Sequence, residues 1–79
     1  MVDEQVLERA YRERLDENII AHLASTKGIS KEAAMDAYYG SRLAGMIEQG
    51  SYGIQYLDFK NLAQILIDTE PERFVGKSL

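Results

Sequence analysis

His22 is the only histidine in the sequence, and histidine is the side chain that ordinarily changes its charge near neutral pH. On a helix it would lie about one turn from Asn18, Ser25 and Thr26. No nucleophile and acidic residue accompany it in the order that known hydrolytic triads use. The sequence therefore predicts no catalytic residue. We expect His22 to be a solvated or hydrogen-bonded helix residue in a protein that is not an enzyme.

The remaining residues that could bind a metal ion or a phosphate lack the required spacing. The chain contains no cysteine, so the usual zinc ligand sets are excluded. Asp68, Glu70 and Glu72 lack the glycine and the spacing of a calcium loop, and we expect them to form a solvated helix end. The glycine-rich segment 50–53 has neither a following lysine nor a preceding strand. The sequence thus predicts no metal ion, no cofactor and no small-molecule ligand.

Tyrosine is the more informative residue type, because four of the five tyrosines fall between positions 38 and 56. Tyrosine combines a large apolar ring with a polar tip and is enriched at protein interfaces. We therefore predict that Tyr39, Tyr52 and Tyr56 form a surface that meets a protein partner, which could be a second copy of the chain. The alternative is that these rings pack the central turn against the helices.

These side chains must be positioned by helices, and the first helix is predicted from about Asp3 to Thr26. Lys27 and Gly28 form its stop signal, because glycine readily adopts the left-handed conformation that ends helices. Its apolar residues recur at every fourth position, which places them along one helix face: Leu7, Tyr11, Leu15, Ile19 and Leu23. The last three of these are predicted core residues.

A second helical segment begins after Ser30, a favourable N-cap residue. Gly40 and Ser41 interrupt the helical spacing near the middle of residues 31–49. Ser41 could cap a new helix, or the glycine could only kink a continuous one. One kinked helix and two short helices therefore remain open.

A compact turn around Gly50 and Gly53 precedes the last helix, which Asp58 is expected to cap. Leu62 and Leu66 lie on the apolar face of this helix and complete the predicted core. Pro71 disfavours further helix. We expect one helical domain over residues 1–70 and a mobile tail over residues 71–79, with Phe74 and Val75 able to fold back.

Composition supports a small acidic protein of the cytoplasm. The 79 residues carry a net charge of −4 and suffice for one domain. The acidic start at Asp3 and Glu4 does not match a secretory signal, and no apolar stretch is long enough to span a membrane. Nine basic residues are scattered among thirteen acidic ones, whereas phosphate binding needs clustered Lys and Arg.

A helix-turn-helix regulator is one alternative, built from the first helix, the turn at Gly28 and the helix after Ser30. A reading helix must offer donors to base edges. The helix after Ser30 instead carries Glu32 and Asp36, which would face phosphate, so we expect no nucleic-acid binding.

Residues 29–34, 37–41, 46–47 and 57–67 resemble a family of short uncharacterised bacterial proteins. In that family a capped helix with a central aromatic–X–Ser element leads into a second helix, a turn and a final apolar helix. Members are often encoded beside ADP-ribosyltransferase-like or other toxin-like genes. The resemblance covers about half of the chain, and it implies neither an enzymatic activity nor particular site residues.

The sequence as a whole predicts an all-α fold, an antiparallel bundle of three to four helices with a compact central turn. The predicted function is a cytoplasmic protein-binding module, the non-toxic partner in a toxin-linked bacterial operon, that acts by docking a tyrosine-bearing face on another protein. The alternatives are the DNA-binding regulator and a homodimeric structural protein in which the first helix pairs with itself.

Overall fold

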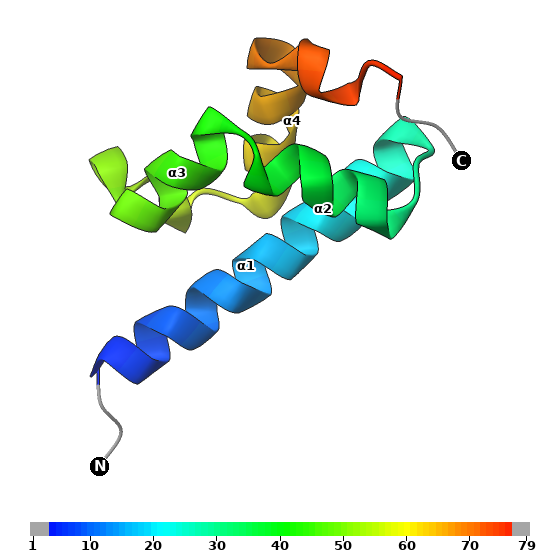
Figure 1. Ribbon diagram of the computed structural model, residues 1–79. Helices are drawn as coiled ribbons and strands as arrows, with labels where there is room; N and C mark the ends of the chain where they lie inside the picture. Colours follow the sequence, from blue (N-terminus) through cyan, green and yellow to red (C-terminus); the bar gives the residue numbers. More distant parts are fainter. Residues whose placement is uncertain (1–3, 77–79) are drawn as a thin grey trace.

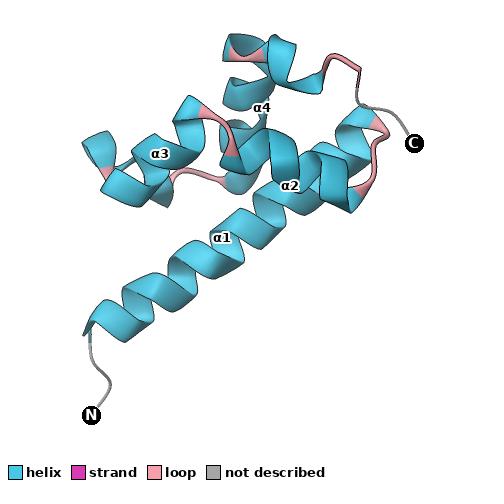
Figure 2. Cartoon of the chain, in the orientation of Figure 1, coloured by secondary structure: helices cyan, strands magenta, loops and turns pink. Residues whose placement is uncertain are grey.

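The computed structural model describes residues 4–76, and within them the side chains of residues 7, 9–50 and 53–76. Four α-helices and two 3₁₀-helices follow one another through short loops, and no strand occurs over these residues (Figures 1 and 2). The predicted all-α fold is therefore confirmed. The elements are α1 (Glu4–Lys27), α2 (Lys31–Tyr39), α3 (Arg42–Gln49), η1 (Ser51–Tyr56), α4 (Phe59–Thr69) and η2 (Pro71–Phe74).

Helix α1 is much longer than the helices that pack on it. Its 24 residues correspond to about 36 Å, whereas the longest of the others, α4, has 11 residues. Helices α2 and α4 both pack against α1, and Figure 1 shows α2 turning back over its C-terminal half while its N-terminal half projects from the bundle. The molecule is accordingly elongated, with extents of 45 × 22 × 18 Å.

Local capping determines where the helices begin and end. Gly28 has φ +64° and ends α1, as predicted. The Ser30 hydroxyl accepts the Ala33 amide N–H at 3.1 Å. Ser41 caps a new helix in the same way, accepting the Ala44 amide N–H at 3.1 Å. Residues 31–49 therefore form two helices rather than one kinked helix.

Glu70 corrects the expectation that residues 68–72 form a solvated helix end. Its side chain is only 2% exposed. The two carboxylate oxygens accept the amide N–H groups of Arg42 and Leu43, at 3.1 and 3.2 Å, and the Arg73 guanidinium donates to Oε1 at 3.0 Å. Burial alone would raise the pKa of Glu70, but these donors outweigh it and lower the pKa below its ordinary value. The carboxylate thus caps α3 from a distant part of the chain.

The core lies between the C-terminal half of α1 and the other helices. All five residues predicted to be core are buried: Leu15, Ile19, Leu23, Leu62 and Leu66. Tyr38 is also buried, at 1% exposure, together with Ile20, Ile29, Leu43 and Ile47.

The segment that follows α4 was expected to begin a mobile tail. Pro71–Phe74 instead forms η2, and Phe74 packs into the core with the Lys27 ammonium 5.4 Å from its ring centroid. Phe74 therefore folds back, whereas Val75 is exposed. The rest of the expected tail, residues 77–79, lies outside the described residues. None of the helices within residues 4–76 is long and apolar enough to cross a membrane.

Candidate functional site

The predicted interface tyrosines lie at two separate places on the surface. Tyr39 ends α2 and is 57% exposed, whereas Tyr56 ends η1 and is 64% exposed. Neither ring belongs to the core. The backbone of Tyr52 lies in η1, but its side chain is outside the described side chains. The structure therefore places the exposed rings of Tyr39 and Tyr56 on different surfaces.

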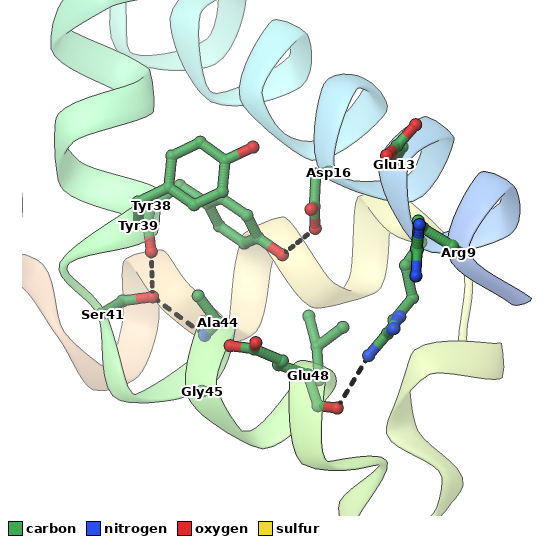
Figure 3. Close-up of a pocket in the computed structure, with 11 residues that line it drawn as sticks. Arg9, Glu13, Asp16, Tyr38, Tyr39, Ser41, Ala44, Gly45 and Glu48 are labelled. Carbon is green, nitrogen blue, oxygen red and sulfur yellow. Dashed lines mark hydrogen bonds between the residues drawn. The ribbon is translucent and has the colours of Figure 1, made fainter. Parts of the chain in front are cut away.

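The first surface, here the Tyr39 hollow, is a depression of about 360 Å³ between α1, α2 and α3 (Figure 3). Helix α1 contributes its side chains at three- and four-residue spacing, which places them on one side of that helix. The residues that line the hollow are Arg9, Arg12, Glu13, Asp16, Tyr38, Tyr39, Ser41, Ala44, Gly45, Ile47 and Glu48.

Asp16 and Tyr38 form the polar base of the Tyr39 hollow. The Tyr38 hydroxyl donates to Asp16 Oδ1 at 2.6 Å (Figure 3). Burial, followed by the bond to Asp16, raises the pKa of Tyr38, so its hydroxyl keeps its proton. Burial also raises the pKa of Asp16, although the Tyr38 hydroxyl and the Arg12 guanidinium oppose that change. Asp16 is thus a half-buried carboxylate whose negative charge is incompletely compensated within the chain.

Tyr39 stands at the rim of this hollow with its ring tilted against that of Tyr38. The two ring centroids are 5.2 Å apart at an interplanar angle of 60°. Burial is the main cause of a raised pKa at Tyr39, and the negative charges of Asp16, Glu17 and Glu13 raise it further. Burial and these three carboxylates therefore disfavour the charged form of the Tyr39 hydroxyl.

Two positive groups, Arg9 and Arg12, also line the Tyr39 hollow. In the view of Figure 3, Asp16 lies between the tyrosine rings and Arg9. Arg12 is already engaged, because its Nη1 donates to the Glu48 carbonyl oxygen at 3.0 Å. The hollow can therefore accept a positively charged side chain between its carboxylates and the Tyr39 ring, where the ring face also attracts cations.

The second surface, here the Tyr56 face, consists of Leu7, Tyr11, Tyr56 and Leu57, all of which are exposed. The rings of Tyr11 and Tyr56 have centroids 5.9 Å apart, and the Tyr11 hydroxyl donates to the Gln55 carbonyl oxygen at 3.1 Å. A shallow depression of about 290 Å³ adjoins these rings and is also lined by Arg14, Asn18, Asp58 and Phe59.

Two residues of these surfaces were missed by sequence reasoning. Asp16 has no motif around it, and only the fold places it against Tyr38. Tyr11 shares the four-residue spacing of the core residues of α1, yet it stays exposed because η1 covers only part of its ring. The predicted first helix is longer than the other predicted helices. This difference in length could have indicated that part of its apolar face, including Tyr11, stays exposed.

The histidine and the possible metal ligands considered in the sequence do not form a site in the described part of the chain. His22 packs edge-on against the Phe59 ring with centroids 6.0 Å apart. Within the part of the chain that the structure describes, no three His, Asp or Glu side chains gather in a way that could hold a metal ion.

Comparison with known proteins adds no relative. No protein-family model matches the chain, and no curated protein or solved structure matches it significantly.

Proposed function

We propose that this protein is a small protein-binding module rather than an enzyme, and that the Tyr39 hollow receives an arginine or lysine side chain of its partner. The observation that carries the proposal is the exposed Tyr39 ring beside an incompletely compensated Asp16 carboxylate. Exposed aromatic rings at the rim of a hollow are the usual anchors of protein interfaces.

The charge of the site favours a basic partner. The Tyr39 hollow is lined by three carboxylates and two guanidinium groups, an excess of one negative charge, and the whole chain has a net charge of −4. An incoming cation would stabilise the charged form of Asp16 and would lie against the Tyr39 ring, a contact worth about 0.5–2 kcal/mol. Electrostatic attraction of this kind also increases the association rate and sets which partners are accepted.

The mode of action that follows is occlusion, in which the docked module covers part of its partner. The resemblance to bacterial proteins encoded near toxin-like genes extends the proposal to a toxin-type enzyme as the partner, bound in the cytoplasm. The acidic residues Glu32 and Asp36 on α2 favour this function over a DNA-binding regulator.

The test is site-specific photocrosslinking in host cells. A photoreactive phenylalanine analogue at position 39 is expected to capture one specific protein, whereas the same analogue at exposed Gln64 on α4 captures none. Absence of any specific product at position 39 would contradict the proposal.

Titration of the captured protein then tests the chemistry of the hollow. Tyr39→Ala should weaken binding by about 30-fold, as expected for loss of an aromatic anchor. Asp16→Asn should also weaken it and reduce its dependence on salt. Gln64→Ala, a change at an exposed residue of α4 outside the hollow, is the control and should leave the affinity unchanged. Equal effects of Tyr39→Ala and Gln64→Ala would contradict this use of the hollow.

A further inference from the structure

The Tyr56 face is an apolar surface that the chain leaves uncovered. Leu7 is 58% exposed, and Tyr11, Tyr56 and Leu57 are exposed beside it. The contact between the Tyr11 and Tyr56 rings and the hydrogen bond from Tyr11 to Gln55 make the face one continuous surface built from α1 and η1. Its position is fixed by the fold, because η1 packs against α3 and holds Tyr56 beside the projecting half of α1.

This face is centred on a different side of α1 from the Tyr39 hollow, and a depression of about 170 Å³ that is lined by Tyr11, Tyr56, Arg12 and Glu48 lies between them. Leu7, Tyr11 and Arg14 follow a four- and three-residue spacing along α1, and Arg9, Glu13 and Asp16 follow the same spacing two positions later. A shift of two residues corresponds to about 200° around a helix, so the two sets lie on opposite sides of α1. Leu7 and Arg14 therefore belong to the part of the Tyr56 face that lies away from the Tyr39 hollow.

The edge of the Tyr56 face carries one positive and one negative side chain. Arg14 and Asp58 both line the depression beside the Tyr11 and Tyr56 rings. A partner of one charge sign would meet one of these residues unfavourably. A second copy related by a two-fold axis brings the same face against itself, so Arg14 of each copy can meet Asp58 of the other.

We propose that the protein forms a symmetric homodimer through the Tyr56 face, with the projecting half of each α1 packed against the other copy. The dimer buries Leu7 and Tyr11 and supplies the burial that a domain of this size lacks. This inference does not depend on the function proposed for the Tyr39 hollow.

Sedimentation equilibrium over a range of concentrations tests the dimer. We expect the wild-type protein to show a reversible monomer–dimer equilibrium. Leu7→Glu and Tyr56→Ala should each raise the dimer dissociation constant by about 30-fold or more, while the dilute proteins unfold at the temperature of the dilute wild type. Tyr39→Ala is the control and should leave the constant unchanged. A strictly monomeric wild type, or a dimer that Leu7→Glu and Tyr56→Ala do not weaken, would overturn the proposal.

A charge exchange tests the two-fold arrangement itself. Arg14→Glu and Asp58→Lys should each weaken self-association, because each variant places like charges opposite one another. A mixture of the two variants should form a heterodimer, in which both charge pairs are again opposite in sign. Because Asp58 also caps α4 by accepting the Lys60 amide N–H at 2.8 Å, circular dichroism of Asp58→Lys verifies its helix content. A correctly folded mixture that associates no better than the separate variants would overturn the two-fold pairing.

Discussion

At the scale of single residues, Glu70 shows how one carboxylate links distant parts of the chain. It follows α4 in sequence and receives the first amide groups of α3 and the Arg73 guanidinium. The N-terminus of a helix carries unpaired N–H groups and a partial positive charge, so a buried carboxylate there is stabilised in its charged form. Ser41, the residue directly before α3, also caps this helix. The first amide groups of α3 therefore have two acceptor side chains, one adjacent in sequence and one distant.

Glu70→Gln is expected to lower the free energy of unfolding at pH 7 by about 1.5–3 kcal/mol, the range for hydrogen bonds to a charged group. The pKa of Glu70 lies below its ordinary value of 4.5 in the folded protein, so the unfolded chain binds the proton more readily. The contribution of Glu70 is therefore present above about pH 4.5 and is lost as the pH falls through the folded pKa. Urea unfolding at pH 7 and pH 3 measures both effects.

The difference between wild type and Glu70→Gln should shrink at pH 3. Glu72→Gln, an exposed neighbour, is the matched control and should change stability by less than about 0.5 kcal/mol at either pH. An undiminished difference at pH 3 would show that the charge of Glu70 has no part in the effect.

At the scale of elements, the length of α1 determines which of its residues become core. Leu15, Ile19 and Leu23 lie where α2 and α4 cover the helix, whereas Leu7 belongs to the half that projects. Isolated helical turns are only marginally stable in water. The N-terminal half of α1 is thus supported by fewer contacts within the chain than its C-terminal half.

Leu23→Ala and Leu62→Ala are each expected to lower the free energy of unfolding by about 2–5 kcal/mol, because each removes a fully buried side chain. Leu7→Ala removes the same atoms from an exposed site. In dilute, monomeric protein it should change stability by less than about 0.5 kcal/mol. Chemical unfolding of the three variants provides the comparison, and equal losses at positions 7 and 23 would contradict the described packing.

At the scale of the whole molecule, the two tyrosine surfaces are centred on different sides of one long helix, and a depression lined by Arg12 and Glu48 lies between them. A dimer through the Tyr56 face would present two acidic hollows, which suits binding of a basic partner at two places. The net charge of −4 disfavours contacts with phosphate groups.

We therefore expect no sequence-dependent binding to duplex DNA at physiological salt. Electrophoretic mobility shifts with a random-sequence duplex library, followed by selection, measure this directly. Enrichment of one sequence with sub-micromolar affinity would favour the helix-turn-helix regulator instead.

The sequence by itself determined the features that depend on neighbouring residues. Ser30, Ser41 and Asp58 cap helices because a cap needs only a short polar side chain two or three residues before the amide it accepts. The core leucines followed from helical spacing, since that spacing sets which side chains share a face.

The tertiary structure decided the features that depend on residues far apart in the chain. Glu70 is buried because α3 begins beside it, and Asp16 meets Tyr38 across 22 positions. Tyr39 and Tyr56 are close in sequence, yet they belong to different surfaces because α3 and η1 separate them. The spacing of residues determines which side chains share a face of one helix. Only the packing of the helices against each other determines which of those faces are buried.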